Sequence, residues 1–406
     1  MLNGCWFSST RPLAASHAEQ PLMDAAPPRI AMVAGEASGD LLAGLLLGGL
    51  RARWPSLKAY GIGGPQMAEQ GFDAWWPHDK LAVRGYVEVL SHYREISGIR
   101  NQLAERLLAD PPDLFIGVDA PDFNLDLEAR LKGKGIRTAH FISPSVWAWR
   151  AKRIEKVHQA VDLMLCVFPF EPALYDKQGV TATYVGHPLA DAIPLEVPRA
   201  QARSALGIDV LQPLVALLPG SRRSEIQYIA PRILLAAREM FRLRPDLRFV
   251  VPVVPGLRHA IEPLRRQHAD GVPIDLLDGR AHEALAACDV ALVASGTATL
   301  EAALFKRPMV ICYTMHALSW QMMKRMKLQP WVGLPNILLG EQAVPELMQG
   351  DATPERLAHA TLAWLDDPLR AAALVERFQA LHLQLRRNTA KTATDAIETL
   401  LQAPRP

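Results

Sequence analysis

The chain has 406 residues, of which 50% are hydrophobic and 21% charged, and its formal net charge is +2. This is the composition of a globular protein that is too long for one compact core, so we expect two α/β domains. A charge so close to zero neither requires nor excludes a nucleic-acid or membrane partner. The cysteines stand far apart, which excludes a paired zinc site and a disulfide framework and indicates a reduced, cytosolic protein. They are Cys5, Cys166, Cys288 and Cys312.

The N-terminal region carries no membrane or export signal. No apolar run reaches the length of about eighteen residues that a spanning helix needs. Residues 1–28 mix polar residues with Trp6 and Phe7 and lack the apolar stretch of a signal peptide. We expect a disordered extension there, and translation could begin at Met1 or at Met23.

Short apolar runs separated by helix-length segments predict a parallel sheet in a first domain, residues 29–193. Each run is expected to form one strand: Arg29–Ala34, Lys58–Ile62, Leu114–Val118, Arg137–Ile142, Leu163–Phe168 and Ala182–Val185. A Pro-rich break near Ala192–Pro198 marks the linker to a second domain.

The second domain, residues 194–353, repeats the same pattern, and a helical tail follows over residues 354–406. Its strands are expected at Leu214–Leu218, Arg248–Val254, Ile274–Leu277, Val290–Ala294 and Met309–Tyr313. We expect the tail to pack back on the first domain or on a partner. Two Rossmann-like domains of this kind face a cleft at the carboxyl ends of their strands, where such folds bind ligands.

A glycine-containing turn follows the first strand. Ser38 and Gly39 lie in the sequence GEASGD, where backbone N–H groups and a helix N-terminus could hold an anion. Glu36 and Asp40 would repel that anion, and the pattern is not the dinucleotide fingerprint. A capped tight turn without a ligand is the alternative, and Asp40 could instead bind an acceptor hydroxyl.

The segment GVDAPDFN places Asp119 at the carboxyl end of the strand Leu114–Val118. An inverting sugar transfer needs one base to take the proton from the attacking hydroxyl, and Asp119 fits that role best. An Asx turn or helix cap is the alternative interpretation, and it suits Asp122 or Asn124 better.

Aromatic and polar residues follow the next strand in the sequence ISPSVWAWR. Ser145, Trp147 and Arg150 suit the wall of a cleft, although the core is the usual place for tryptophan. His187 lies in VGHP at the domain junction, where a structural hydrogen bond and a catalytic role are both open.

In the second domain, LLPGSRRSEI can hold a diphosphate. Gly220 and Ser221 open a helix, and the guanidinium of Arg222 would neutralise a leaving UDP. An arginine pair on a solvated helix turn is the alternative.

The sequence ASGTATLE indicates a nucleotide-sugar site. Ser295, Gly296 and Thr297 would donate hydrogen bonds to phosphates, and Glu301 one turn later could accept from both ribose hydroxyls. Glu301 as an ordinary helix surface residue is the alternative. Because the metal-binding motifs are missing from the sequence, we predict transfer without a metal or other cofactor.

Taken together, these segments resemble the lipid-A-disaccharide synthase family from about Arg29 to beyond Glu346. The motifs that carry the resemblance occur in the family's order: VAGEASGD, GIGGPQM, GVDAPDFN, ISPSVWAWR, VGHP, LLPGSR, ASGTATLE and LPNILLG. The resemblance implies a GT-B glycosyltransferase that joins UDP-2,3-diacylglucosamine to 2,3-diacylglucosamine 1-phosphate through a β-1,6 linkage and releases UDP. It implies Asp119 as the base, Arg222 as a diphosphate contact, and Ser295 to Glu301 with Asn336 as the UDP pocket. Ser38 and Asp40 would lie on the acceptor side.

Acylated substrates imply work at the inner membrane of a Gram-negative bacterium by a cytoplasmic, peripheral protein. The segment 85–99 is the candidate contact, because its apolar residues fall mostly on one helical face. They are Val87, Val89, Leu90, Tyr93 and Ile96. A helix packed on the core is the alternative. The resemblance also implies a homodimer with exchanged C-terminal segments, and nothing indicates nucleic-acid binding.

Two rival functions remain at the level of sequence. One is another UDP-GlcNAc enzyme of the same fold, such as the peptidoglycan GlcNAc transferase or a UDP-GlcNAc 2-epimerase, which shares the Ser-Gly-Thr to Glu pattern. The other is a nucleotide- or lipid-binding module without catalysis. The GEASGD motif and the Trp-containing segment argue against the first rival.

Overall fold

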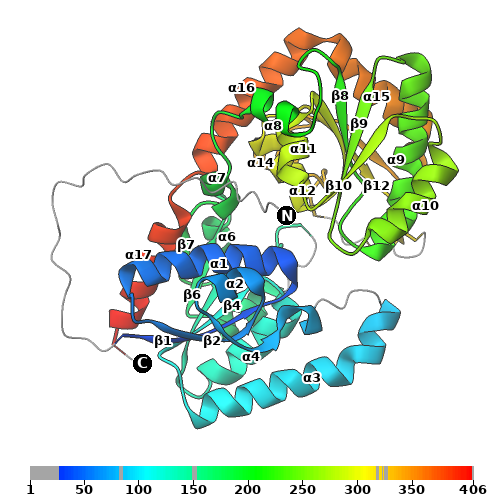
Figure 1. The fold of residues 1–406 in the computed structure, drawn as a ribbon. Helices are drawn as coiled ribbons and strands as arrows, with labels where there is room; N and C mark the ends of the chain where they lie inside the picture. Colours follow the sequence, from blue (N-terminus) through cyan, green and yellow to red (C-terminus); the bar gives the residue numbers. More distant parts are fainter. Residues whose placement is uncertain are drawn as a thin grey trace.

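The computed structural model describes residues 27–81, 86–148, 153–316, 320–321, 323 and 328–404. It contains two α/β domains connected by a linker and by the C-terminal helices (Figure 1). The predicted disordered extension, with Met1 and Met23, lies almost entirely in residues 1–26, outside the described residues.

The first domain contains a seven-stranded sheet in the order β3-β2-β1-β4-β5-β6-β7, in which every pairing is parallel. Its strands are β1 (Arg29–Ala34), β2 (Lys58–Gly63), β3 (Asp73–Pro77), β4 (Leu114–Val118), β5 (Arg137–Phe141), β6 (Leu163–Cys166) and β7 (Ala182–Tyr184). The central strands are continuous apolar runs because helices cover both faces of the sheet. These helices are α1 (Glu36–Arg53), α2 (Pro65–Glu69), α3 (Tyr86–Ala109), α4 (Pro121–Lys132), α5 (Arg153–Ala160), α6 (Pro172–Asp176) and α7 (Pro188–Ala192), with the 3₁₀ turn η1 (His78–Leu81).

The second domain contains a six-stranded parallel sheet in the order β10-β9-β8-β11-β12-β13. Its strands are β8 (Leu214–Leu218), β9 (Arg248–Val253), β10 (Ile274–Asp278), β11 (Val290–Ala294), β12 (Met309–Tyr313) and β13 (Glu346–Met348). Its helices are α8 (Arg199–Ala205), α9 (Arg223–Leu243), α10 (Arg258–His268), α11 (Ala281–Ala287), α12 (Thr297–Leu304) and α14 (Leu334–Leu339), with η2 (Gln349–Asp351). The predicted α/β class with two Rossmann-like parallel sheets is therefore confirmed.

Two edge strands escaped the sequence analysis, and one helix begins earlier than expected. Strand β3 has an exposed and intermediate burial pattern, and β13 has only three residues, so neither shows a continuous apolar run. Helix α1 begins at Glu36, with Gly35 as its N-cap. Ser38, Gly39 and Asp40 therefore lie within the first turns of a helix and not in an open loop.

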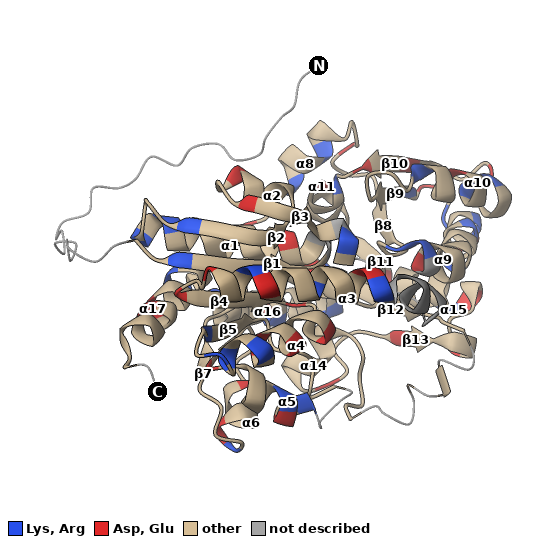
Figure 2. Cartoon of the chain, turned by 90° about the horizontal axis from the view of Figure 1, so that it is seen from below, with Lys and Arg blue, Asp and Glu red and all other residues tan. Residues whose placement is uncertain are grey.

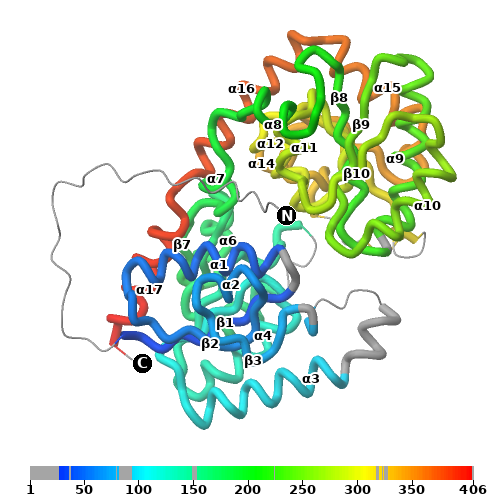
Figure 3. Tube along the Cα trace, viewed as in Figure 1, coloured from blue at the N-terminus to red at the C-terminus, as the bar shows by residue number. Residues whose placement is uncertain are grey.

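The C-terminal helices return the chain to the first domain, as the orange and red tube in Figure 3 shows. Helix α15 (Pro354–Asp366) packs against α9, and α16 (Pro368–Leu385) runs past α12 and α7. Helix α17 (Thr389–Gln402) packs on α1, where Arg53 pairs with Asp395 at 2.5 Å and also with Glu398.

A buried lysine, Lys306, connects helix α16 with the linker between the domains. Lys306 follows α12 and is only 6% exposed. Its Nζ lies 3.3 Å from the carbonyl of Pro194 in the linker and 2.7 Å from Nδ1 of His382 on α16. The other ring nitrogen of His382 lies 2.8 Å from the carbonyl of Ala190. These hydrogen bonds therefore connect the end of α12 with the linker, α16 and α7.

Charged side chains of both signs are interspersed over the two domains, as Figure 2 shows. No helix within the described residues is both long enough and apolar enough to cross a membrane.

The contact between α1 and α17 yields a stability test at two adjacent glycines. A Cβ added at Gly49 would lie 2.7 Å from Cβ and 2.9 Å from the carbonyl oxygen of Ala390, so Gly49→Ala must push α17 away. A Cβ added at Gly48 meets only the flexible side chain of Gln70, at 3.3 Å. In urea titrations, Gly49→Ala should lower the free energy of unfolding by about 1–3 kcal/mol, whereas Gly48→Ala should raise it by about 0.5–1 kcal/mol. Equal effects of the two substitutions would contradict this close helix contact.

Candidate functional site

The strand order places the predicted motifs at two equivalent points. In each sheet the order reverses next to the first strand, between β1 and β4 and between β8 and β11. Loops at such a reversal diverge and leave room for a ligand at the carboxyl ends of the strands. GEASGD follows β1 and GVDAPDFN follows β4, while LLPGSR follows β8 and ASGTATLE follows β11. The predicted motifs thus flank both reversal points.

Asp119 directly follows β4 and has a strained backbone. Asp119 and Ala120 have φ of 51° and 43°, a left-handed conformation that is unfavourable for residues other than glycine. The N–H of Asp119 donates to the carbonyl of Phe141 at 3.0 Å, and its own carbonyl accepts from Nδ2 of Asn124 at 2.8 Å. Among the described residues the half-buried carboxylate of Asp119 has no hydrogen-bond or ion-pair partner, so it is available to a substrate hydroxyl.

Asp40 has a different role from the one expected. Its carboxylate is only 2% exposed and accepts from the backbone N–H groups of Gly64, Gln66 and Met67, at 2.8, 2.9 and 3.2 Å. A Cβ at Gly64 would lie 2.6 Å from Oδ2, so this loop closes tightly around the carboxylate. Asp40 therefore caps the N-terminus of α2 as a positioning residue, and its carboxylate is used on backbone groups and not, as expected, on an acceptor hydroxyl.

The start of α1 nevertheless lies beside Asp119. A Cβ at Gly35 would lie 3.0 Å from Cβ of Ala120, and one at Gly39 would lie 3.9 Å from the carbonyl of Val118. Ser38 on the same turn is exposed. The N-terminus of α1 and the end of β4 thus form one surface.

Trp147 belongs to the core, which is the alternative that its sequence left open. It is 9% exposed, its Nε1 donates to Oε1 of Glu171 at 3.0 Å, and its ring meets Phe168 edge-on. Burial raises the pKa of Glu171 to about 7. Glu171 had no sequence signal, because nothing marks it as the partner of a tryptophan. Ser145 is exposed, and Arg150 lies outside the described residues.

His187 is the N-cap of α7. Its Nδ1 accepts from the N–H of Leu189 at 3.2 Å, and its ring stacks on Phe168. Its backbone N–H donates to the carbonyl of Leu385 on α16 at 2.9 Å. Burial lowers the pKa of His187 to about 4, so the ring is neutral near pH 7. Of the two alternatives open in the sequence, the geometry favours the structural hydrogen bond.

The loop after β8 is held by Glu225, a residue that the sequence did not indicate as part of the site. Gly220 has φ of 115°. The N–H of Ser221 and the guanidinium of Arg222 each donate to Glu225 at 2.8 Å, and the backbone N–H of Arg222, the N-cap of α9, donates to the same carboxylate at 3.3 Å. Glu225 has the spacing of the capping box, but Arg222 stands where that signal has Ser or Thr. The Arg222 side chain remains 40% exposed, so its guanidinium can still reach a ligand.

The turn after β11 is open to ligand. Gly296 has φ of 143°, and nothing lies within 4 Å of the position that a Cβ would occupy there. Thr297 is exposed and begins α12, while Oγ of Ser295 donates to the carbonyl of Val332 at 3.4 Å. The N–H of Ser295 also donates within the protein, to the carbonyl of Cys312 at 3.2 Å, so the donors that can approach a phosphate here are those of Gly296 and Thr297.

Glu301 lies one turn along α12, and its side chain is 21% exposed. Its Oε1 lies 3.2 Å from Nε2 of His282 on α11, a residue that no motif singled out. The carboxylate is thus oriented by one partner and keeps acceptor capacity for ribose hydroxyls.

Asn336 is fully buried, and its side chain is occupied within the protein. Its Nδ2 donates to the carbonyl of Val344 and to Oε1 of Glu346, and its Oδ1 accepts from the N–H of Val344, all at 2.9 Å. Glu346 also accepts from the N–H groups of Val332 and Gly333. Asn336 therefore positions the segment before α14, and its expected direct contact with UDP is not supported.

That segment also bridges the two domains. The N–H of Leu328 donates to the carbonyl of Ala148 at 3.0 Å, and Nε2 of Gln329 donates to the carbonyl of Trp147 at 3.5 Å. Ser295 is hydrogen-bonded to Val332 in the same segment. Residues 328–333 therefore connect the turn after β11 in the second domain with the segment after β5 in the first.

Most of the residues expected to contact the membrane have side chains outside the described part of the structure. The side chains of Val87, Val89, Leu90 and Tyr93 are not described. Ile96 on α3 is partly buried and packs against the core cluster that includes Leu103 and Phe115, which fits the alternative of a core-packed helix at this position.

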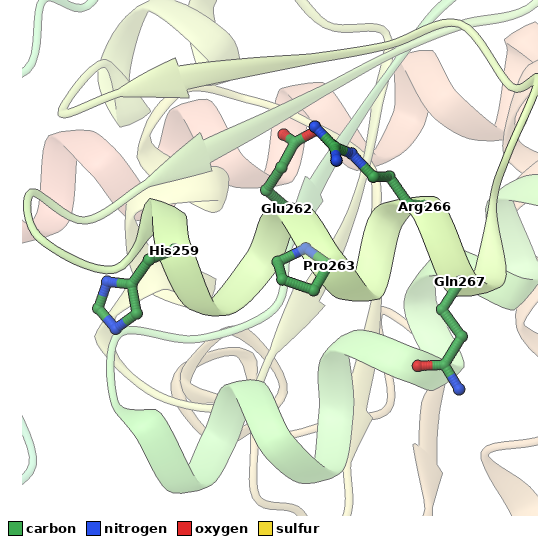
Figure 4. A pocket seen from close by; sticks show the side chains of 5 residues that line it. All are labelled: His259, Glu262, Pro263, Arg266 and Gln267. Carbon is green, nitrogen blue, oxygen red and sulfur yellow. The ribbon is translucent and has the colours of Figure 1, made fainter.

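Two surface hollows lie away from these residues. One runs along the exposed face of α10, as Figure 4 shows, and is lined by His259, Glu262, Pro263, Arg266 and Gln267. The other lies at the amino ends of β4 and β5, lined by residues 111–113 and 134–137 with Leu108. Neither hollow is lined by a residue of the predicted site. The candidate site is therefore located by the loops at the carboxyl ends of the strands. No cluster of three or more metal-ligating side chains occurs within the described residues.

The sequence matches the family described as lipid-A-disaccharide synthetase over residues 30–398. Lipid-A-disaccharide synthases of Albidiferax ferrireducens and Burkholderia pseudomallei are 57% and 54% identical to it, over 92% and 94% of this chain and 97% and 98% of their own lengths. The chain belongs to the lipid-A-disaccharide synthase family. It is accordingly a disaccharide-forming glycosyltransferase of lipid A biosynthesis, as the resemblance implied.

Solved structures of low identity show the fold of this synthase-family chain. The UDP-GlcNAc 2-epimerase of Neisseria meningitidis, bound to UDP-GlcNAc, has a TM-score of 0.62 and 11% identity, over 92% of this chain and 100% of its own. The kitacinnamycin glycotransferase has a TM-score of 0.60 and 16% identity, over 93% of this chain and 100% of its own. The expected GT-B architecture is confirmed.

The buried ring of His187 predicts an acid-sensitive contribution to stability. The unfolded chain binds a proton below a pKa of 6.5, whereas the folded chain resists protonation until about 4. The free energy of unfolding should therefore fall as pH drops from 6.5 towards 4, by roughly 3 kcal/mol at most from this group. His187→Asn, which can still accept from Leu189, should remove that part of the slope in urea titrations across pH. The exposed His259→Asn serves as control, and a slope retained in His187→Asn would show that another group carries it.

Proposed function

We propose that this chain transfers a 2,3-diacylglucosaminyl group from UDP to the 6-hydroxyl of 2,3-diacylglucosamine 1-phosphate. The observation that carries the proposal is the pairing of Asp119 at one reversal point with the Arg222 loop and the Ser295 turn at the other. The bridge through residues 328–333 supports joint action of the two groups. Family membership decides against the epimerase and the peptidoglycan transferase, which share the fold and the Ser-Gly-Thr to Glu pattern.

In this reaction Asp119 is the general base. Its carboxylate takes the proton of the acceptor hydroxyl while the oxygen attacks the anomeric carbon of the donor. The bond from that carbon to the diphosphate breaks on the opposite face, so an α-linked donor gives a β-linked disaccharide. The lack of an internal partner for the carboxylate among the described residues supports this role.

The second domain stabilises the leaving group. As charge develops on UDP, the guanidinium of Arg222 and the N-terminus of α12 provide donors and positive potential. Glu301 would accept from the ribose hydroxyls, held by His282. Because these groups can offset the diphosphate charge, we propose that transfer needs no metal ion, so EDTA should leave the rate unchanged.

Because both proposed substrates carry acyl chains, the enzyme must reach them at a lipid surface. We propose that the protein binds the inner-membrane surface through the N-terminal part of α3, where Arg94 is exposed. We also propose a homodimer that exchanges the α17 segment. Such an exchange would reuse the ion pairs of Arg53 with Asp395 and Glu398 between two chains, and light scattering of the purified protein tests it.

Replacing the base gives the first functional prediction. Asp119→Asn should fold, retain UDP binding in calorimetry, and lower kcat for UDP release by about 10²–10⁴-fold, because the proton acceptor is lost. Asp122→Asn, an exposed carboxylate three residues along, is the matched control and should keep near-normal turnover. Full turnover by Asp119→Asn would remove this residue as the base and revive a module without catalysis at this site.

Replacing the diphosphate contact gives the second. Arg222→Ala should weaken UDP binding by roughly tenfold to a hundredfold, since a hydrogen bond to a charged group contributes about 1.5–3 kcal/mol. Turnover should fall together with affinity. The adjacent and exposed Arg223→Ala should change neither. Loss of affinity in Arg223→Ala alone would move the contact to the neighbouring side chain.

A further inference from the structure

A buried polar cluster lies directly beneath the end of β4. It consists of Asn124 and Glu128 on α4 and His140 on β5, all 0% exposed. Nδ1 of His140 lies 2.8 Å from Oε1 of Glu128. Gly117 on β4 pairs with His140, and a Cβ there would lie 2.2 Å from Oε1 of Glu128 and 2.9 Å from Cβ of Asn124. The strand therefore makes room for the cluster at its last glycine.

This cluster is costly for stability. Burial raises the pKa of the Glu128 carboxyl. Oδ1 of Asn124, Oε2 of Glu128 and Nε2 of His140 have no hydrogen-bond partner among the described residues. A buried polar atom without a partner lowers stability, so apolar side chains of similar size would fit this site at lower cost. A requirement for stability alone does not explain the cluster.

The cluster is connected to the candidate base through one amide. Nδ2 of Asn124 donates to the carbonyl of Asp119 at 2.8 Å and lies 3.4 Å from the carbonyls of Val118 and Val33. Three carbonyl oxygens face this nitrogen, so the reverse orientation of the amide would be repulsive. The Asp119 carbonyl belongs to the peptide between Asp119 and Ala120, the two residues with left-handed backbones. Holding that oxygen fixes ψ of the first residue and φ of the second.

We propose that Asn124 is a positioning residue for the Asp119 carboxylate, and that Glu128 and His140 pack beneath it to keep its amide in place. The inference rests on the proposed function of Asp119 as the base. Without the amide, the two strained residues relax towards ordinary backbone angles, and the carboxylate leaves its position at the strand end. The UDP site in the other domain is unaffected.

Asn124→Asp tests this directly, because it keeps the shape and replaces the donor by an oxygen facing three carbonyls. With UDP-2,3-diacylglucosamine and the acceptor, kcat should fall by about 10–100-fold, since a misplacement near 1 Å can cost that much. KM for the acceptor and Kd for UDP should stay within about twofold of the native values. Asn124→Ala, which removes the donor without adding repulsion, should show the same pattern if the aspartate variant does not fold.

Thr138→Val is the matched control. Thr138 is buried on the same strand as His140 and donates to the carbonyl of Ala160 at 2.8 Å, away from Asp119. This substitution should lower the free energy of unfolding and leave kcat unchanged. A comparable fall of kcat in Thr138→Val would mean that any buried polar loss in this domain reduces turnover, which overturns the proposal.

A double substitution separates this inference from the proposed function. In an Asp119→Ala background, Asn124→Asp should not reduce the residual single-turnover rate further, because it acts only through the lost carboxylate. An equal reduction in both backgrounds overturns the positioning role and leaves Asp119 as the base. Normal kcat in a folded Asn124→Asp protein does the same. Full turnover by Asp119→Ala alone would overturn both the proposed function and this inference.

Discussion

The parallel direction of all strands in each sheet is the constraint on which the rest of the structure depends. In each sheet, all strands end at the same edge, and the loops that follow them carry the motifs. Motifs about 180 residues apart along the sequence can therefore bind a single ligand where the two domains meet. The join is made twice. Residues 328–333 connect the Ser295 turn to the segment after β5, and α16 and α17 return the chain to α1. The buried Lys306 stabilises the second of these connections, through the carbonyl of Pro194 in the linker and Nδ1 of His382 on α16.

Within this frame, the polar residues divide into those that reach a ligand and those that hold the backbone. Asp119, Arg222, Thr297 and Glu301 keep an exposed or unpaired polar group. Asp40, His187, Asn336 and Glu346 use their side chains on backbone groups near the same strand ends. The second group explains why the strand-end loops keep their shape, since each satisfies backbone donors or acceptors that would otherwise be buried without a partner.

The sequence predicts most of this fold because the central strands are continuous apolar runs between helices. It misses β3 and β13, whose side chains are only partly covered at the sheet edges. It places Asp119 correctly at the end of β4, because a position after a strand is a local property. It does not predict that Asp40 caps α2, or that Asn336 bonds Val344 and Glu346, because those contacts depend on how distant loops close. Glu171 and His282 carry no motif at all, and only their neighbours in space reveal them.

One carboxylate in the first domain is proposed to activate the acceptor while the second domain holds an acylated UDP-sugar. The most direct test is the turnover of UDP-2,3-diacylglucosamine against deacylated UDP-glucosamine with the same acceptor, with the anomeric configuration of the product read by NMR. We expect a β-1,6-linked product from the acylated donor and little or none from the other. Equal turnover of both donors, or an α-linked product, would contradict it.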